Sequence, residues 1–411
     1  MTDKKLRVLL LCAHPTQYSS PMWRLIAQRP EMDVLVAYCS LRGAESHIDP
    51  GFGVEVAWDV PLLDDYPWVH LKNRSPRPDI NTFFGLVNPG VWPLIRSGKF
   101  DAVAIFTGYL CATFWIAAVA AKVSGASLIF GTDAHNLNPR DQRSWKIRVK
   151  RHLWPRLFRL ADIVIAPSSG TLAMMRSLRI PSERVLLMPY VVHNEWWSEN
   201  IKQVDRIVVR RNWNIPADAP VVLFCAKLQP WKRPQDLLLA FASANVPGSY
   251  LVYAGDGPMR SALETEANRL GISDRTRFLG FVNQSTLPQV YCASDLLVLP
   301  SEYEPFGLVV NEAMLCGCAV IVSDRVGAKF DLIREGKTGF AYPCGDIGAL
   351  AKLLQSTLSD RDALRQYGEC AKQRIAEWSP QAYVDSFVAA IHRALELRNS
   401  ANRRNRPVSK A

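Results

Sequence analysis

Short runs of branched apolar residues recur along the whole chain, and a segment with helical spacing follows each of them. Residues 6–12 and 33–38 begin the series, and residues 221–226 and 250–254 begin a second one. Because these runs are continuously apolar rather than alternating, they predict strands that are buried on both faces. Strands of this kind, alternating with helices, are typical of α/β folds with parallel sheets.

The length of the chain predicts two domains, because 411 residues are more than one ordinary hydrophobic core contains. We expect an N-terminal Rossmann-like domain over residues 1–196 and a C-terminal one over 210–375, facing each other across a cleft. Residues 376–397 are expected to form a helix that packs back across the junction. The basic tail, 398–411, is expected to be disordered.

The composition is that of a folded protein with reduced thiols. Hydrophobic residues make up 48% of the chain and charged residues 21%, which excludes an intrinsically disordered chain. The nine cysteines form no C-x-x-C pair, so we expect a cytoplasmic protein without disulfides. The start of the chain predicts a first strand rather than a signal peptide. The longest helical apolar stretch, 109–121, is shorter than the roughly 20 residues that a membrane span needs.

Positive charge is concentrated in two segments of a chain whose net charge is +11. Residues 140–159 contain eight lysines and arginines against one aspartate, and residues 398–411 contain five and no acid. The first segment also contains Trp145, Val149 and Leu153, a mixture that suits a helix lying on an anionic membrane. The alternative is a helix that packs its apolar side on the core. A nucleic-acid partner is not expected, because no known binding signature accompanies the charge.

The most specific local signal is the pair of carboxylates Glu304 and Glu312, which flank a Pro-Phe-Gly turn between a buried strand and an apolar helix. Such a turn leaves the backbone N–H groups of Gly307, Leu308 and Val309 at a helix start, where phosphate binds. A carboxylate on each side can hold sugar hydroxyls, so the pattern predicts recognition of a nucleotide diphosphate sugar. The alternative, a carboxylate that only partners the helix dipole, would fit Glu304 but not Glu312.

Two lysines, Lys227 and Lys232, lie in the loop after the predicted strand 221–226. Breaking a sugar–phosphate bond leaves a diphosphate whose growing charge is neutralised by a metal or by fixed cations. No Asp-x-Asp pair follows an apolar strand in this chain, so the lysines are predicted to take the place of a metal. Solvated loop lysines without such a role are the alternative.

Glycines follow the predicted strand 250–254, in the order Gly255, Asp256, Gly257. The third glycine of a dinucleotide fingerprint is missing, and the first βα turn, 14–21, has no glycine at all. A nicotinamide cofactor is therefore not expected. The glycines instead predict a tight turn that faces the cleft.

In this order and spacing, the segments resemble the donor domain of the family 4 retaining glycosyltransferases, which have the two-Rossmann GT-B fold. The resemblance rests on the two lysines, the turn 255–258, the segment 278–282 and the two glutamates, and it is strongest over residues 220–345. It implies a retaining transfer from a nucleotide diphosphate sugar, without a metal or other cofactor. The family's usual Gly-Arg is Ala226-Lys227 here, which keeps the charge but loses the bidentate fork of arginine.

The resemblance also implies roles for individual residues. Glu312 would bond the ribose hydroxyls, Glu304 would bond those of the transferred sugar, and the loop 280–282 would lie beside the base. The predicted catalytic residues are Lys227, Lys232, Glu304 and His135. The predicted donor-binding residues are Glu312, Phe306, Gly307, Leu308, Val309, Gly255, Asp256, Gly257, Phe281 and Val282.

The N-terminal half is expected to bind the acceptor. Asp133 and His135 follow the predicted strand 127–131 and so point at the cleft. By the resemblance, His135 would orient the acceptor or stabilise charge, and a hydrogen-bonded loop residue is the alternative. His14, Gln17 and Tyr18 lie on the first βα loop and are further acceptor-side candidates.

These patterns together predict a transferase that moves a sugar onto a saccharide or lipid-linked acceptor in bacterial-type polysaccharide or glycoconjugate synthesis. We expect it in the cytoplasm, at the inner face of the membrane if residues 140–159 contact lipid. A nucleotide-sugar epimerase of the same fold and an inactive nucleotide-sugar-binding scaffold are the alternatives. The identities of the sugar, the nucleotide and the acceptor do not follow from the sequence.

Overall fold

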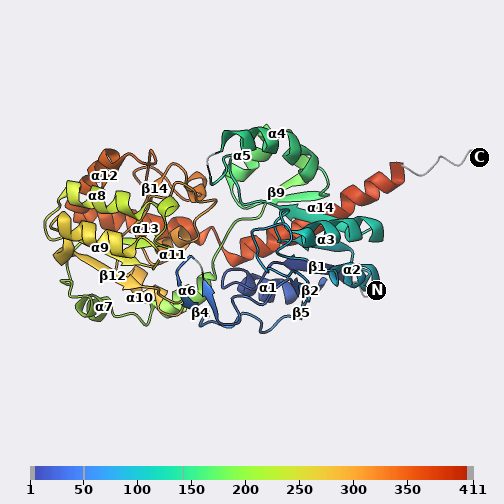
Figure 1. The fold of residues 1–411 in the computed structure, drawn as a ribbon, viewed down its shortest axis with the longest axis horizontal. Helices are drawn as coiled ribbons and strands as arrows, with labels where there is room; N and C mark the ends of the chain where they lie inside the picture. Colours follow the sequence, from blue (N-terminus) through green and yellow to red (C-terminus); the bar gives the residue numbers. More distant parts are fainter. Residues whose placement is uncertain (1–4, 50, 142, 405–411) are drawn as a thin grey trace, which may run out of the picture. The chain divides into compact units, whose positions relative to one another are not determined.

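The computed structural model describes residues 5–49, 51–141 and 143–404, the last four without their side chains, and it divides the chain into two compact units (Figure 1). Unit 1 contains the residues up to Glu45, Pro61–Pro189 and those from Pro380 on. Unit 2 contains Ser46–Val60 and Tyr190–Ser379. This division differs from the expected one at the segment 46–60, which the sequence boundaries assigned to the N-terminal domain.

Unit 1 is built on a seven-stranded parallel sheet with the order β5-β2-β1-β6-β7-β8-β9. The strands are β1 (Leu6–Cys12), β2 (Met32–Tyr38), β5 (Trp68–His70), β6 (Ala102–Ile105), β7 (Ser127–Gly131), β8 (Ile163–Ala166) and β9 (Val185–Leu187). Every residue of β6 and β8 is buried, as expected for central strands with helices on both faces.

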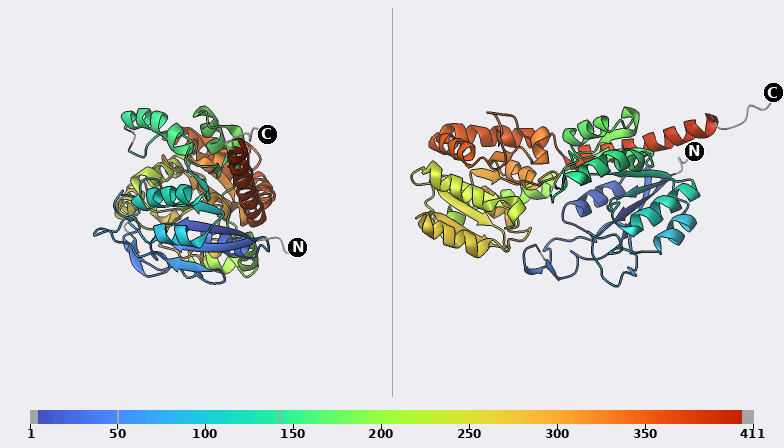
Figure 2. Two further views of the ribbon diagram at one scale, coloured as in Figure 1. Left: turned by 90° about the vertical axis from the view of Figure 1, so that its right-hand side faces the viewer. Right: turned by 45° about the horizontal axis from the view of Figure 1, so that its top comes forward.

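The helices of unit 1 come from both ends of the chain (Figure 2). They are α1 (Ser19–Ala27), α2 (Val91–Gly98), α3 (Ala112–Ser124), α4 (Ser144–Phe158), α5 (Ser169–Ser177) and α14 (Pro380–Arg404), with the 3-10 turn η1 (Ser182–Arg184). Helix α14 packs against α1, β7 and β8. The tail that was expected to be disordered from residue 398 therefore continues this helix to Arg404, and residues 405–411 lie outside the described part.

Unit 2 contains a six-stranded parallel sheet with the order β12-β11-β10-β13-β14-β15. Its strands are β10 (Val221–Cys225), β11 (Tyr250–Ala254), β12 (Thr276–Gly280), β13 (Leu296–Leu299), β14 (Ala319–Ser323) and β15 (Gly339–Tyr342). Its helices are α6 (Asn194–Ile201), α7 (Arg206–Asn212), α8 (Pro234–Ala244), α9 (Arg260–Arg269), α10 (Leu287–Cys292), α11 (Val309–Leu315), α12 (Ile347–Ser359) and α13 (Arg361–Ala376). The prediction of two parallel-sheet α/β domains is confirmed.

A short antiparallel hairpin completes unit 2. It consists of β3 (His47–Asp49) and β4 (Val54–Val56), which come between two strands of unit 1 in the sequence. Figure 1 shows β4 in the blue of the N-terminal part. These strands do not follow from the sequence pattern, because each contributes only three residues and neither forms a continuous apolar run.

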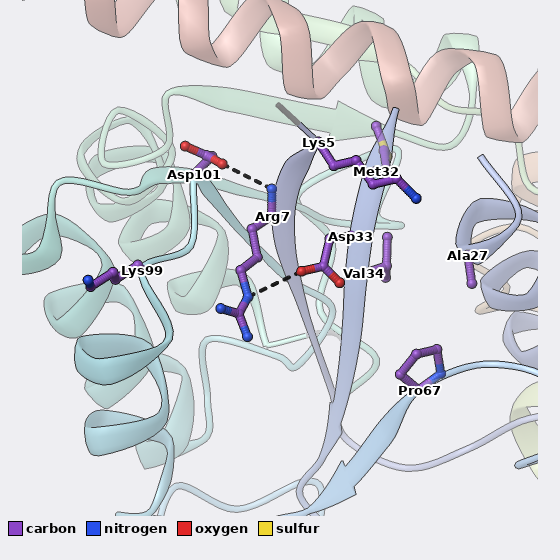
Figure 3. A pocket seen from close by; sticks show the side chains of 9 residues that line it. All are labelled: Lys5, Arg7, Ala27, Met32, Asp33, Val34, Pro67, Lys99 and Asp101. Atoms are coloured by element: carbon purple, nitrogen blue, oxygen red, sulfur yellow. Dashed lines mark hydrogen bonds and ion pairs between the residues drawn. The ribbon is translucent and has the colours of Figure 1, made fainter. Parts of the chain in front are cut away.

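A hollow in unit 1 lies at the amino ends of β1 and β2 (Figure 3). Its polar lining is held together by Arg7, whose Nε lies 3.4 Å from Asp33 and whose backbone N–H donates to Asp101 at 2.9 Å. Open α/β sheets bind their ligands at the opposite edge, outside the carboxyl ends of the strands. The hollow is therefore not the candidate site.

Candidate functional site

The strand order of unit 2 reverses between β10 and β13, and the predicted charged residues lie at the carboxyl ends of these two strands. Lys227 and Lys232 follow β10, and Glu304 follows β13. The ammonium group of Lys232 forms an ion pair with the carboxylate of Glu304, and both side chains are mostly buried. Such a reversal is where doubly wound sheets bind ligands. The fold thus brings together one predicted cation and one predicted carboxylate at a ligand-binding position.

The second lysine, Lys227, is paired with a residue that the sequence analysis did not single out. Its Nζ donates to Oδ1 of Asp49 at 2.6 Å and lies 4.6 Å from the centre of the Phe52 ring. Burial favours a neutral Asp49, but hydrogen bonds from Lys227 and from the N–H groups of Gly51 and Phe52 outweigh it and lower the pKa of Asp49. Asp49 is therefore an anion, and it forms an ion pair with Lys227, which is predicted to bind phosphate.

The two glycines after β11 allow the loops at this edge to lie against one another. A Cβ on Gly255 would lie 2.0 Å from the carbonyl oxygen of Ala226, and one on Gly257 would lie 2.7 Å from that of Leu228. Both glycines have positive φ, +146° and +151°, which other residues rarely adopt. The N–H of Gly255 also donates to the carbonyl of Gly280 at 2.8 Å. The loops after β10, β11 and β12 consequently form one continuous rim.

Two other predicted donor residues on this rim have local partners. Asp256 accepts hydrogen bonds from Arg260 at 2.9 Å and from the N–H of Gly257 at 2.8 Å, so it stabilises the turn and the start of α9. The ring of Phe281 packs edge-on against Phe52 at 4.8 Å. Val282 and Phe281 line a hollow beside α10.

The turn before α11 follows β13, in the order of strand, turn and helix that the sequence predicted. Gly307 has φ +100°, and a Cβ there would lie 3.0 Å from Leu299. Phe306 is buried and packs edge-on against Tyr190 at 5.4 Å. Since α11 begins at Val309, the N–H groups of Gly307, Leu308 and Val309 lie at the helix start, where the helix supplies no acceptors.

The two predicted glutamates have different surroundings. Glu304 lies on the loop and remains partly exposed, whereas Glu312 is fully buried on α11. The Oε2 atom of Glu312 accepts a hydrogen bond from the hydroxyl of Tyr291 at 2.7 Å. The predicted contact of Glu312 with a ribose stays a prediction. In this structure the carboxylate joins α11 to α10.

The acceptor-side candidates lie in unit 1, at the carboxyl edge of its sheet. His14, Gln17 and Tyr18 are half-buried between β1 and α1, and Asp133 is exposed and His135 half-buried after β7. Only β6 separates β1 from β7, so the two loops start about 10 Å apart. The five candidates therefore share one edge of the sheet.

The described residues contain no group of three or more histidine, cysteine or acidic side chains that could hold a metal ion. All nine cysteines are free. Cations at the carboxyl edge of the unit 2 sheet include Lys227 and Lys232, Arg233, which pairs with Asp236, and Arg260, which is bound to Asp256 and Glu264.

Two family models match the sequence. The model described as glycosyl transferases group 1 matches residues 205–374, and the one described as glycosyl transferase 4-like domain matches residues 24–191. D-inositol 3-phosphate glycosyltransferase 2 of Catenulispora acidiphila is 33% identical over 203 residues, which are 47% of this chain and 47% of that protein. N-acetyl-alpha-D-glucosaminyl L-malate synthase of Bacillus anthracis is 32% identical over 219 residues, 53% of this chain and 55% of that protein. The chain spans about half the length of these curated relatives.

Solved structures resemble the chain over most of its length. Anabaena Alr3699/HepE in complex with UDP aligns with a TM-score of 0.71 at 20% identity, covering 94% of this chain and all of that one. WaaG, a glycosyltransferase involved in lipopolysaccharide biosynthesis, aligns with a TM-score of 0.61 at 16% identity, covering 92% of this chain and 98% of that one. At these identities the likeness shows the fold alone, and it confirms the GT-B architecture that the sequence predicted.

Proposed function

The chain belongs to the group 1 glycosyl transferases, with a 4-like domain in its N-terminal half, and we propose that it transfers a sugar from a nucleotide diphosphate sugar to a saccharide or lipid-linked acceptor. The observation that carries this proposal is the grouping of Lys227, Lys232 and Glu304 where the strand order of unit 2 reverses. The group 1 model matches this same part of the chain.

A nucleoside diphosphate suits the charges at this rim. Lys227 and Lys232 supply two cations, and each is held by a carboxylate that an incoming phosphate can replace. The N–H groups at the start of α11 add neutral donors. Structures that share the fold have been solved with UDP and with UDP-glucose, which supports a donor of this class.

The proposed reaction retains the configuration at the anomeric carbon and uses no metal. The bond between that carbon and the diphosphate oxygen breaks, and a bond from an acceptor hydroxyl oxygen to the same carbon forms on the same face. The acceptor proton passes to the departing diphosphate. Lys227 and Lys232 offset the charge that grows on the diphosphate, and Glu304, freed from Lys232, binds hydroxyls of the transferred sugar.

The acceptor would bind the edge of unit 1 that presents His14, Gln17, Tyr18, Asp133 and His135. Two of these are histidines, whose ring nitrogens can donate or accept a hydrogen bond. Either could orient an acceptor hydroxyl before it attacks. Their proposed role is to position the acceptor, since the proton itself leaves with the diphosphate.

The surface of α4 supports a position at the inner face of an anionic membrane, and with it a lipid-linked acceptor. This helix buries Trp154, Leu157 and Phe158 in the core, as the alternative to membrane contact expects. It nevertheless leaves Trp145, Val149 and Leu153 exposed, at intervals of four residues and therefore on one side. Exposed apolar side chains among basic ones are typical of helices that lie on membranes. Among the described residues, no helix is long and apolar enough to cross a bilayer.

The neighbouring helix α3 also has an exposed apolar row. It leaves Trp115, Val119 and Val123 exposed, again four residues apart. The indole N–H of Trp154 on α4 donates to the hydroxyl of Tyr109, just before α3, at 3.0 Å, so the two helices are neighbours in unit 1. Both exposed apolar rows support peripheral contact with lipid.

Calorimetric titration of the full chain with UDP, GDP and ADP tests the donor site directly. We expect at least one nucleotide to bind, and Lys232→Ala to weaken its binding about tenfold or more, as for the loss of a hydrogen bond to a charged group. Lys337→Ala, which removes an exposed lysine elsewhere in unit 2, is the matched control. Equal losses in both variants, or no binding, would contradict the assignment.

Incubation with the matching nucleotide sugar separates transfer from the two alternatives. An epimerase would convert the sugar without any acceptor, and an inactive scaffold would bind the donor and leave it unchanged. Slow release of free sugar, with water as acceptor, is the result expected for a transferase. Activity that disappears with a chelator and returns with Mn²⁺ would contradict the role of the lysines.

A further inference from the structure

The hairpin of β3 and β4 lies on the rim of the proposed donor site, and its contacts involve two separate loops of unit 2. On one side, Lys227 donates to Asp49, and the Nε2 atom of Gln229 donates to the carbonyl of Gly51 at 3.0 Å. These partners belong to the loop after β10. The tip of the hairpin is thus bonded to the loop that supplies both predicted diphosphate-binding lysines.

On the other side, the hairpin is bonded to the loop after β12. The side-chain amide of Asn283 donates to the carbonyl of Ala57 at 2.7 Å, and the N–H of Ser285 donates to Asp59 at 3.0 Å. The hydroxyl of Ser285 also donates to Asp59. The described residues of the segment, 46–49 and 51–60, therefore reach from the β10 loop to the β12 loop.

Aromatic and close backbone contacts fix the hairpin between these two ends. Phe281 lies 4.8 Å from Phe52 and 6.2 Å from Trp58, measured between ring centres. At the tip, a Cβ on Gly51 would lie 2.6 Å from Cδ and 2.8 Å from Nζ of Lys227. A glycine at this position lets the backbone lie directly against the lysine.

The group that pairs with Lys227 is the carboxylate of Asp49, which is an anion like the phosphate of a donor. Asp49 keeps its charge, because it accepts hydrogen bonds from Lys227 and from two backbone N–H groups. A carboxylate oxygen and a phosphate oxygen compete for the same ammonium protons. The lysine cannot give its full charge to a diphosphate while Asp49 remains in place.

We propose that the segment 46–60 is an internal occupant of the donor site, in which Asp49 holds Lys227 until a nucleoside diphosphate displaces it. This inference rests on the proposed function, which supplies the class of ligand, a nucleoside diphosphate. No covalent step is involved: one ion pair of Lys227 is exchanged for another. The affinity for the donor is lowered by the free energy needed to release Asp49, so removing its charge makes binding tighter.

Titration calorimetry on the full chain with UDP, GDP and ADP tests the exchange. Asp49→Asn is expected to bind whichever nucleotide the wild type binds about two- to fivefold more tightly, the range for a partly exposed ion pair. Glu55→Gln removes the same charge from the same hairpin without touching Lys227, and its affinity should match the wild type. In a Lys227→Ala background, Asp49→Asn should have no effect.

The outcomes of this titration distinguish a failure of the occupant role from a failure of the proposed function. Unchanged or weaker binding by Asp49→Asn would overturn the occupant role and leave the donor site standing. An equal gain in Glu55→Gln would show a general charge effect and would also overturn it. No binding of any nucleotide by the wild type would overturn the proposed function, and this inference with it.

Hydrogen exchange gives a second readout that does not depend on affinity. With saturating nucleotide, peptides from 46–60 should exchange faster, because the hairpin loses its bond to Lys227. Peptides covering 227–232 should exchange more slowly, because the ligand replaces that bond. Slower exchange in both segments would mean that the hairpin closes over the nucleotide, and would overturn displacement.

Discussion

The hydroxyl of Tyr291 donates a hydrogen bond of 2.7 Å to Glu312, and neither side chain is exposed to solvent. Burial, together with the nearby carboxylate of Glu312, raises the pKa of Tyr291 well above its ordinary value, so the hydroxyl keeps its proton and can donate. A carboxylate removed from water depends on such donors. The bond links α10 to α11, the helix that starts at the proposed phosphate-binding turn.

Tyr291→Phe is therefore expected to destabilise the protein by about 1–3 kcal/mol, because it leaves a buried acceptor without its donor. Urea denaturation of the full chain measures this. Tyr342→Phe is the matched control, since its buried hydroxyl has no hydrogen-bond partner within the described ranges. The same loss in both variants would contradict a special role for the Tyr291 hydroxyl.

Glu304→Gln is expected to separate the binding of nucleotide from the transfer of sugar. The change removes the negative charge beside Lys232, so the affinity for a nucleoside diphosphate should stay the same or rise. Transfer should fall by about tenfold or more, because the amide binds sugar hydroxyls less strongly than a carboxylate does. Calorimetry with the diphosphate and a transfer assay measure the two effects. A parallel loss of both would mean that Glu304 is needed to hold Lys232 in position for the phosphate.

Gly255→Ala is expected to damage the donor rim even though it adds only a methyl group. The new Cβ would lie 2.0 Å from the Ala226 carbonyl at a backbone φ of +146°, so the loop before Lys227 must move. We expect a loss of stability of about 1–3 kcal/mol and weaker nucleotide binding. Gly348→Ala, whose Cβ would meet only Asp346 at 3.5 Å, is the control and should be close to neutral.

The sheets of the protein could be predicted because their strands are continuously apolar. The run 6–12 forms β1, and 250–254 forms β11, with the same bounds. The fold then brings Lys232 and Glu304 together through the strand order, which the resemblance implied but the spacing of the residues alone does not determine. The local sequence pattern and the parallel topology together were sufficient to predict the part of the site that contains Lys232 and Glu304.

The hairpin and the hydrogen-bond partner of the buried Glu312 could not be predicted, because both depend on contacts between distant segments. Asp49 lies between Ile48 and Pro50 in a segment that forms no recognisable motif, and only folding brings it to Lys227. Glu312 was expected to face a ligand, and the hydroxyl that binds it comes from another helix, α10. The apolar and basic residues of α4 could be read from the sequence. Which of the apolar residues are buried could not, because this depends on how the helix packs.

Acid should release the hairpin. The pKa of Asp49 is lowered in the folded protein, so its pairing with Lys227 adds stability above the ordinary aspartate pKa of about 3.9 and loses it as the pH falls through the folded value. The wild type should melt at a higher temperature than Asp49→Asn at pH 7. The difference should shrink below about pH 4. A difference that grows with acid would contradict the ion pair, and Glu55→Gln controls for general charge.

The exposed row on α4 predicts binding to anionic vesicles. Trp145, Val149 and Leu153 are 54%, 41% and 57% exposed, and basic residues lie beside them. The protein should sediment with vesicles that contain phosphatidylglycerol and much less with pure phosphatidylcholine, and high salt should weaken this binding. Changing the three residues to serine should lower the partition by about tenfold or more, because their apolar surface no longer enters the lipid.

The control for this experiment lies in unit 2, where α7 exposes Ile207 and Val208. Changing these two residues to serine removes apolar surface from a helix outside the proposed membrane face, so vesicle binding should stay as in the wild type. Equal binding to both kinds of vesicle would contradict the electrostatic part of the argument. An unaffected triple serine variant would contradict the contact itself, and the eight basic residues of 140–159 would then be a solvated surface.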